Sequence, residues 1–176
     1  MSFDVTALPG ATFGGLVTAP INAADIVSAA EASPAALPGL LNQFNGFLLV
    51  KGMDGLEAKP ELLLRLSQFF GTEVESYHET RMAQHNVHPE IPEILLVSNI
   101  PPADRKPPPQ PDPPRNADGS LPIKFPHRRG WHTDQSYRRP PPDISLFFSV
   151  VAAPKGQAQT LYANGIAAYE GVSSET

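Results

Sequence analysis

The stretch GWHTDQSY, at residues 130–137, places a histidine and a carboxylate two positions apart, as His132 and Asp134. In an extended backbone, residues i and i+2 point to the same face, so the imidazole nitrogen and the carboxylate oxygen would converge on one point. Such a pair supplies two of the three ligands of a 2-His-1-carboxylate facial triad, the usual protein site for non-haem Fe(II). A His-x-Asp pair also arises by chance, so other features of the sequence are needed to distinguish a metal site from a chance motif.

The composition limits the kinds of site that the chain can build. Its 176 residues are enough for one domain with a hydrophobic core. The 13 Lys and Arg residues against 18 Asp and Glu give a formal net charge of −5, which argues against nucleic acid as a main partner. The absence of cysteine excludes disulfides and thiolate metal sites. A metal would therefore use His, Asp or Glu, which favours iron, manganese or zinc.

The sequence contains no targeting or membrane signal that we recognise. The first residues, MSFDV, lack the basic region and apolar run that are typical of a signal peptide. No apolar stretch approaches the length needed to span a bilayer. We therefore expect a cytoplasmic protein without a membrane partner.

The N-terminal part, residues 13–100, has an α/β pattern. Residues 13–17 predict a short edge strand. Asn22 is a plausible N-cap for a helical segment, which Pro34 and Pro38 divide into two short helices. The Asn45-Gly46 pair predicts the end of the second helix.

Residues 47–50 are entirely apolar and predict a buried strand. Pro60 fits the first turn of a further helix that ends at Gly71. The apolar face expected for that helix consists of Leu62, Leu63, Leu66, Phe69 and Phe70. Residues 94–97 predict another strand.

Proline dominates residues 101–126, which contain ten of the 21 prolines of the chain. Such a segment supplies few backbone donors, and we assign it no regular structure. Two interpretations stay open. It is either a disordered or polyproline linker, such as an SH3-type ligand, or a long loop that brings the chain to a functional site.

The C-terminal part continues the strand pattern. Residues 144–151 give the strongest strand signal in the chain, and residues 159–162 predict a further short strand. Asn164 is expected to cap a short helix over residues 166–169.

Together these motifs resemble those of the taurine dioxygenase (TauD/TfdA) family of Fe(II)- and 2-oxoglutarate-dependent dioxygenases. The likeness is strongest from residue 130 to residue 171 and is collinear from about residue 13. The residues that carry it are Trp131, His132, Thr133, Asp134, Ser136, Tyr137, Pro142, Ser145, Leu146, Pro154, the run at 160–164 and the run at 167–170. Earlier features also agree in order, namely the strand at 47–50, the Phe70-Gly71 turn and the run at 97–100.

The resemblance implies a fold, an activity and a set of site residues. The fold is a double-stranded β-helix (jelly-roll) core with N-terminal α/β elements. The activity is the oxidative decarboxylation of 2-oxoglutarate by Fe(II) and O2, coupled to hydroxylation of a small organic substrate. His132 and Asp134 match the first two iron ligands, and Thr160 matches the threonine that holds a carboxylate of 2-oxoglutarate. No catalytic residue is expected beyond the metal ligands.

Substrate contacts are expected from Tyr77, His78 and Arg128. Tyr77 and His78 lie near where the family reaches toward substrate. Arg128 and Arg129 precede the iron motif, where they either attract an anionic substrate or form solvated surface.

The chain departs from the family pattern in two places. Gln157-Ala158-Gln159 replaces the Gly-Gly-Asp that commonly precedes the threonine, which puts the grip on 2-oxoglutarate in doubt. No histidine follows His132 and no arginine follows Arg139, although the family takes its third iron ligand and its 2-oxoglutarate arginine from downstream.

We therefore expect a single partial domain that corresponds to the N-terminal half of the enzyme. Its parts are the α/β part at 13–100, the proline-rich loop at 101–129 and the iron motif with the first core strands at 130–176. The C-terminal part of the jelly roll would be missing, so we expect weak or no activity from the chain alone. A homo-oligomer or a complementing C-terminal half would cover the apolar edge left open.

Three alternatives remain at this stage. His127, His78, His85 or His88 could serve as a substitute third ligand. The spacing of the last three could also indicate a second metal cluster, but Pro89 and the polar surroundings favour a loop with surface or substrate-facing histidines. The chain could instead be a non-catalytic oligomeric or binding module with the proline-rich loop as the partner site. A zinc hydrolase that uses His132 and Asp134 would need a general base, and none is recognisable nearby.

Overall fold

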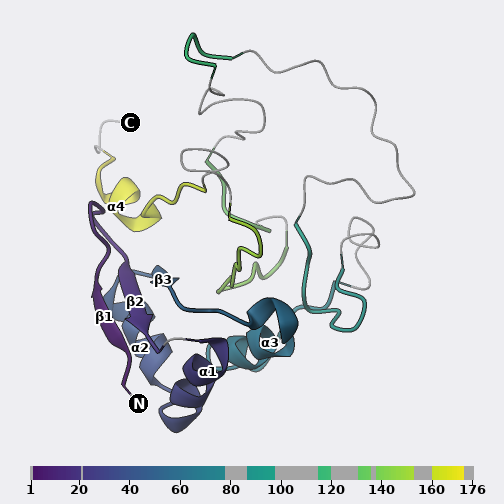
Figure 1. Cartoon of the computed structure of the whole chain (residues 1–176). Coiled ribbons are helices and arrows are strands. Elements are labelled where there is room, and N and C mark those ends of the chain that lie inside the picture. The colour runs from purple at the N-terminus through teal and green to yellow at the C-terminus, as the bar shows by residue number, and fades with distance from the viewer. Residues whose placement is uncertain are drawn as a thin grey trace. The chain divides into compact units, whose positions relative to one another are not determined.

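The computed structural model describes residues 2–20, 22–77, 87–97, 115–119, 131–135, 138–152 and 160–172. The chain packs as two units, one of Met1–Val97 with Tyr162–Thr176 and the other of Ser98–Leu161. All helices and strands of the described residues belong to the first unit (Figure 1). None of these helices has the length and apolarity required to cross a bilayer.

The first unit contains a small mixed sheet of three strands in the order β1-β2-β3. Strand β1 (Asp4–Ala7) pairs antiparallel with β2 (Gly15–Ala19), and β2 pairs parallel with β3 (Leu48–Val50). A parallel pair requires a long crossover connection, because the chain must return to the same end of the sheet. Two helices, α1 (Ala23–Ala32) and α2 (Ala36–Gln43), fill this crossover.

Helix α1 provides much of the core. It starts where predicted, because the side chain of Asn22 accepts a hydrogen bond of 3.0 Å from the backbone N–H of Asp25. Its inward side chains Ile26 and Val27 are almost completely buried. The core of the described residues consists of Val17, Ala23, Ile26, Val27, Ala29, Ala30, Leu37, Leu56, Leu62 and Leu66.

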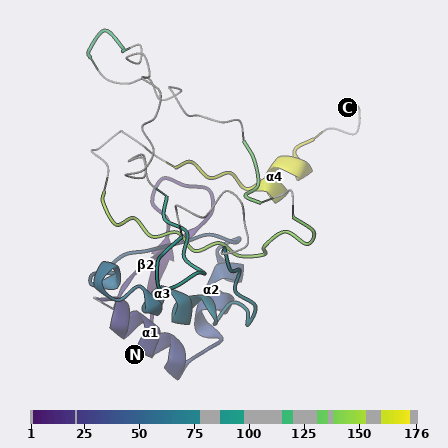
Figure 2. The same cartoon turned by 90° about the vertical axis from the view of Figure 1, so that its right-hand side faces the viewer.

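Helix α3 (Glu61–Ser67) covers α1 and follows a short 3₁₀ turn at Leu56–Ala58. The two helices lie side by side in both views (Figures 1 and 2). Leu62 and Leu66 are buried, as the predicted apolar face requires, but the helix ends at Ser67 and not at Gly71, so Phe69 and Phe70 lie beyond it. Arg65 forms an ion pair with Glu31 of α1 at the surface.

The predicted end of the second helix is confirmed. Asn45 has φ 56° and Gly46 has φ 82°, so both adopt the left-handed conformation that commonly terminates helices. The N–H of Gly46 donates to the carbonyl of Leu41 at 2.8 Å. This reversal leads the chain directly into β3, so the strand predicted at residues 47–50 is present from Leu48 to Val50, but it is not buried as predicted, because Leu49 is 41% exposed.

The last helix, α4 (Gly165–Glu170), is also confirmed in place and in its cap. The Asn164 side chain accepts hydrogen bonds from the N–H groups of Ile166 and Ala167. None of the helix residues is buried, and Tyr169 is 81% exposed. Within the first unit, the ring of Tyr162 packs on the ring of Phe47, with 4.7 Å between the centroids.

Several predicted strands are absent from the described residues. The strand predicted at residues 13–17 is found at Gly15–Ala19 as β2. It is the central strand and not an edge strand, because Asp4–Ala7, for which we predict no strand, pairs with it on the side opposite β3. Residues 94–97 contribute one isolated bridge, from Leu95 to Val87. Residues 160–162 form no strand, and residue 159 lies outside the described part.

The strongest strand prediction, at 144–151, is wrong for the conformation described. Those residues form no regular structure. Phe147 is 67% exposed and Val151 is 84% exposed. A β-branched and aromatic sequence becomes a strand only when a partner strand accepts its backbone hydrogen bonds and buries one face. The described residues supply no such partner, so the jelly-roll core stays a prediction.

Two glycines provide a test of the packing between α2 and the sheet. A Cβ on Gly15 in β2 would lie 2.8 Å from the ring of Phe44 and 2.9 Å from Leu48, whereas a Cβ on Gly39 in α2 would meet nothing within 4 Å. We expect Gly15→Ala to lower the free energy of unfolding by about 1–3 kcal/mol through overpacking. The matched Gly39→Ala should raise it by about 0.5–1 kcal/mol, because alanine is the better helix former.

Urea denaturation followed by far-ultraviolet circular dichroism would measure both changes. Equal effects of the two substitutions would contradict the close packing of β2 against Phe44.

Candidate metal centre

The two predicted iron ligands are in direct contact. Nε2 of His132 lies 3.1 Å from Oδ1 of Asp134. Residues 131–133 are not in a strand, so the convergence does not depend on the sheet geometry that we expected. A turn begins at Asp134 and continues through Gln135, which has φ 52°. The backbone N–H of Arg138 donates to the carbonyl of Gln135 at 2.9 Å and closes this turn.

The spacing of the two donor atoms fits a shared metal ion. Ligands at about 2.1 Å from a metal and at a right angle to each other lie about 3.0 Å apart, close to the observed distance. The side chains of His132 and Asp134 are 59% and 74% exposed, so an ion could reach both. A neutral imidazole and a carboxylate are also the donors that suit non-haem iron. Where no metal is bound, the same two atoms can share a hydrogen bond.

A third protein ligand is not found among the described residues. No group of three His, Cys, Asp or Glu side chains there is arranged to hold a metal ion. Three of the histidines proposed as substitutes, His78, His85 and His127, lie outside the described residues. The fourth, His88, belongs to the first unit, whereas His132 and Asp134 belong to the second.

Thr160, the residue expected to hold 2-oxoglutarate, is exposed. A threonine hydroxyl can both donate and accept a hydrogen bond, so Thr160 has the chemistry to contact a carboxylate. It shares a unit with His132 and Asp134. Among the described candidate residues of that unit, the structure shows a contact between His132 and Asp134 and none that involves Thr160.

Of the predicted substrate contacts, Tyr77 is described and half-buried. Its backbone N–H donates to the carbonyl of Pro92 at 2.8 Å, which attaches it to the loop that carries His88. His78 and Arg128 lie outside the described residues.

His88 is held more firmly than the sequence suggested for a loop residue. Its backbone N–H donates to the carbonyl of Ile94 at 2.9 Å. Its ring nitrogen Nδ1 faces the N–H groups of Glu90 and Ile91, each at 3.2 Å. Because Nδ1 accepts these bonds, the neutral ring carries its proton on Nε2, which is then a donor. Pro89 indicates a turn in the sequence, but residue preferences alone do not predict that the His88 ring closes this turn by accepting hydrogen bonds.

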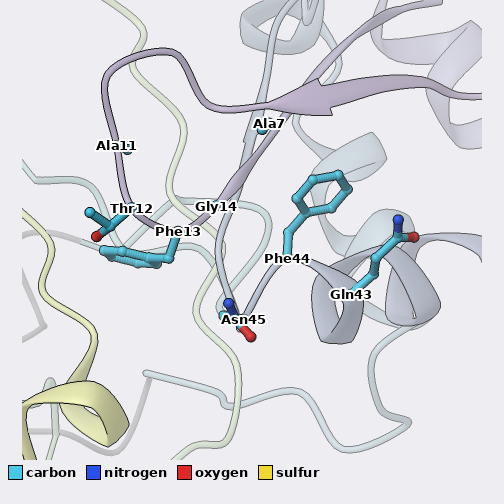
Figure 3. A pocket seen from close by; sticks show the side chains of 8 residues that line it. All are labelled: Ala7, Ala11, Thr12, Phe13, Gly14, Gln43, Phe44 and Asn45. Atoms are coloured by element: carbon cyan, nitrogen blue, oxygen red, sulfur yellow. The ribbon is translucent and has the colours of Figure 1, made fainter.

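The first unit also has a shallow, partly open cavity of about 140 Å³ (Figure 3). It lies between the loop that follows β1 and the C-terminal end of α2. Its lining consists of Ala7, Ala11, Thr12, Phe13, Gly14, Gln43, Phe44 and Asn45. No titratable side chain is among these residues, so the cavity offers neither a metal ligand nor an acid or base.

The pair of adjacent metal donors followed by a closed turn defines a candidate mononuclear metal protein. Comparison with known families gives its class. The profile of the taurine catabolism dioxygenase TauD, TfdA family matches residues 5–176, so the chain belongs to this family. Alpha-ketoglutarate is another name for 2-oxoglutarate.

A curated relative supports the same class over a shorter stretch. A segment of 44 residues, 25% of this chain, is 50% identical to a Saccharomyces cerevisiae protein named alpha-ketoglutarate-dependent sulfonate dioxygenase. The matched segment covers 10% of the length of that relative. No solved structure matches the chain.

Proposed function

We propose that the intact protein is an Fe(II)- and 2-oxoglutarate-dependent dioxygenase that hydroxylates a small organic anion. The observation that carries this proposal is the 3.1 Å approach of His132 Nε2 to Asp134 Oδ1 in a chain of the TauD, TfdA family. The name of the yeast relative supports a sulfonate as the substrate class.

In this mechanism, the side chains of His132 and Asp134 would hold the metal ion. The bound iron would supply the oxidising chemistry, with O2 as the oxidant and 2-oxoglutarate as the co-substrate. His132 must be neutral and Asp134 ionised, because each donates a lone pair. The exposed Thr160 hydroxyl would orient a carboxylate of 2-oxoglutarate by a hydrogen bond.

The chain presents two protein ligands for a site that the family completes with three. We propose that the 176 residues alone bind iron weakly and turn over slowly. The support is the absence of any histidine after His132 and of any arginine after Arg139. A ligand from another polypeptide or segment would then be needed for full activity.

A non-catalytic module is the second candidate function. The observation that favours it is the exposure of large apolar side chains, including Phe147, Tyr169 and Val151. Such surface is normally covered by another protein surface. This candidate and the dioxygenase are separated by iron binding, which a binding module does not require.

Replacement of His132 should remove the metal site. We expect His132→Ala to weaken Fe(II) binding roughly a hundredfold or more, because a direct ligand contributes at least as much as an outer-shell partner. Anaerobic Fe(II) titration by calorimetry would measure this, followed by addition of 2-oxoglutarate to look for the visible charge-transfer band of its iron chelate. The control is Glu57→Ala, which removes an exposed acidic side chain from the first unit and should bind iron like the wild type. Equal iron binding by wild type and His132→Ala would refute the site.

Replacement of Thr160 should affect the co-substrate and leave the metal unchanged. We expect Thr160→Val, which keeps the shape of the side chain, to weaken 2-oxoglutarate binding about tenfold through loss of one hydrogen bond to a charged group. Thr160→Ser should retain most of the affinity. The intensity of the charge-transfer band against 2-oxoglutarate concentration gives both values. A parallel loss of iron affinity in Thr160→Val would indicate a structural role instead.

An incomplete ligand set should also be visible in turnover. We expect the purified chain to form succinate from 2-oxoglutarate little faster than His132→Ala, and added imidazole to increase the wild-type rate by supplying a ring nitrogen to the open position. Succinate would be quantified by chromatography, with His132→Ala plus imidazole as the control. Rapid, sustained succinate formation without imidazole would show that the chain is complete as an enzyme.

A further inference from the structure

The loop from Val87 to Leu95 is held mainly by its own hydrogen bonds. None of its residues is buried, so packing against a core contributes little to its stability. An isolated bridge joins Val87 to Leu95, and the N–H of His88 donates to the carbonyl of Ile94 at 2.9 Å. Two residues of the loop are prolines, which have no N–H to donate. The few remaining donors therefore determine whether the loop stays closed.

The ring of His88 accepts hydrogen bonds from two of these donors. Its Nδ1 faces the N–H groups of Glu90 and Ile91, each at 3.2 Å. A ring nitrogen can accept a hydrogen bond only while it carries no proton, and in the charged imidazolium both nitrogens are donors. Protonation of Nδ1 therefore removes the acceptor of both bonds and places one N–H group against two others.

The same loop is bonded to a residue of the preceding segment. The backbone N–H of Tyr77 donates to the carbonyl of Pro92 at 2.8 Å. Pro92 directly follows Ile91, whose N–H faces the His88 ring and whose carbonyl accepts a bond of 3.0 Å from the N–H of Ile94. The position of the Pro92 carbonyl thus depends on the turn that the His88 ring closes.

We propose that His88 makes this loop a pH-sensitive switch that controls the attachment of Tyr77. The neutral ring closes the turn and keeps Tyr77 bonded to Pro92, whereas protonation of Nδ1 opens the turn and weakens that bond. The closed form is therefore favoured at high pH and is lost as the pH falls through the range in which the ring takes up a proton. Histidine is the side chain that ordinarily changes charge between about pH 5 and pH 8. The switch does not depend on the proposed metal site.

Other titratable groups lie on the loop and on the segment bonded to it. Those among the described residues are Glu90 and Glu93 on the loop and Glu73, Glu75 and Tyr77 on the segment. Carboxylates ordinarily change charge near about pH 4 and phenols near about pH 10. A transition between these two ranges is therefore the signature of an imidazole.

The test follows backbone amides of the 176-residue chain by nitrogen–proton NMR from about pH 8 to about pH 5. Amide hydrogen exchange, corrected for the intrinsic rate at each pH, gives the protection of each N–H group. His88→Asn keeps an acceptor, because its side-chain oxygen is attached at the same position as Nδ1 and can bond to N–H groups further along the chain, but it does not titrate. His88→Leu removes the acceptor at every pH. Both variants retain the other four histidines, so any effect of those side chains is common to all three proteins.

In the wild type we expect the protection of the Ile91 and Tyr77 amides to fall about tenfold from the upper to the lower pH, the loss expected for about one hydrogen bond. His88→Asn should keep the high-pH protection throughout. His88→Leu should resemble the protonated wild type at both ends of the range. The amide of Ile26 in α1, which donates to the carbonyl of Asn22, is the internal reference and should not change.

Constant protection in the wild type would refute the switch, and so would an equal fall in His88→Asn or full protection of His88→Leu at the upper pH. An equal loss at Ile26 would show general unfolding in acid and would also reject a local switch. The Fe(II) titration of His132→Ala is a separate measurement, so the result for this loop stands whether or not the metal site is confirmed.

Discussion

The parallel pairing of β2 with β3 is the constraint on which the folded part of the structure depends. Parallel neighbours cannot be joined by a tight turn, so the chain between them must leave the sheet and return. Helices α1 and α2 make this return, and α1 buries Ile26 and Val27 in doing so. The left-handed residues Asn45 and Gly46 then reverse the chain at the entrance to β3. The core of the first unit is thus a consequence of one strand pairing and the connection that it requires.

The elements predicted correctly from the sequence share a local cause. Asn22 and Asn164 cap helices through hydrogen bonds to residues two or three positions away, and Asn45-Gly46 ends a helix through its own backbone conformation. Such signals are complete within a few residues, so the sequence alone contains them. Helix α4 illustrates the point, because it forms although none of its residues is buried.

The elements predicted wrongly depend on partners that are distant in sequence. Residues 144–151 have a strong strand composition, but a strand needs neighbours to accept its hydrogen bonds, and none is present in the described residues. The opposite error occurred at Asp4–Ala7, for which we predicted no strand although Val5 and Thr6 are β-branched. There, pairing with β2 in a defined register supplied the order that propensity did not indicate. In both cases, contacts with residues distant in sequence determine whether the segment forms a strand.

The candidate metal centre likewise combines a local feature, which the sequence predicts, with a long-range requirement, which it does not. His132 and Asp134 meet because they are two residues apart, and they do so without the strand that was expected to align them. A facial triad needs a third donor, which in this sequence cannot be a histidine that follows His132. The two candidate ligands that are close in sequence can therefore be predicted from the sequence, whereas a third ligand from a distant position cannot. Since each ligand adds to affinity and fixes geometry, a site with only its local half would select a metal by charge and donor type more than by shape.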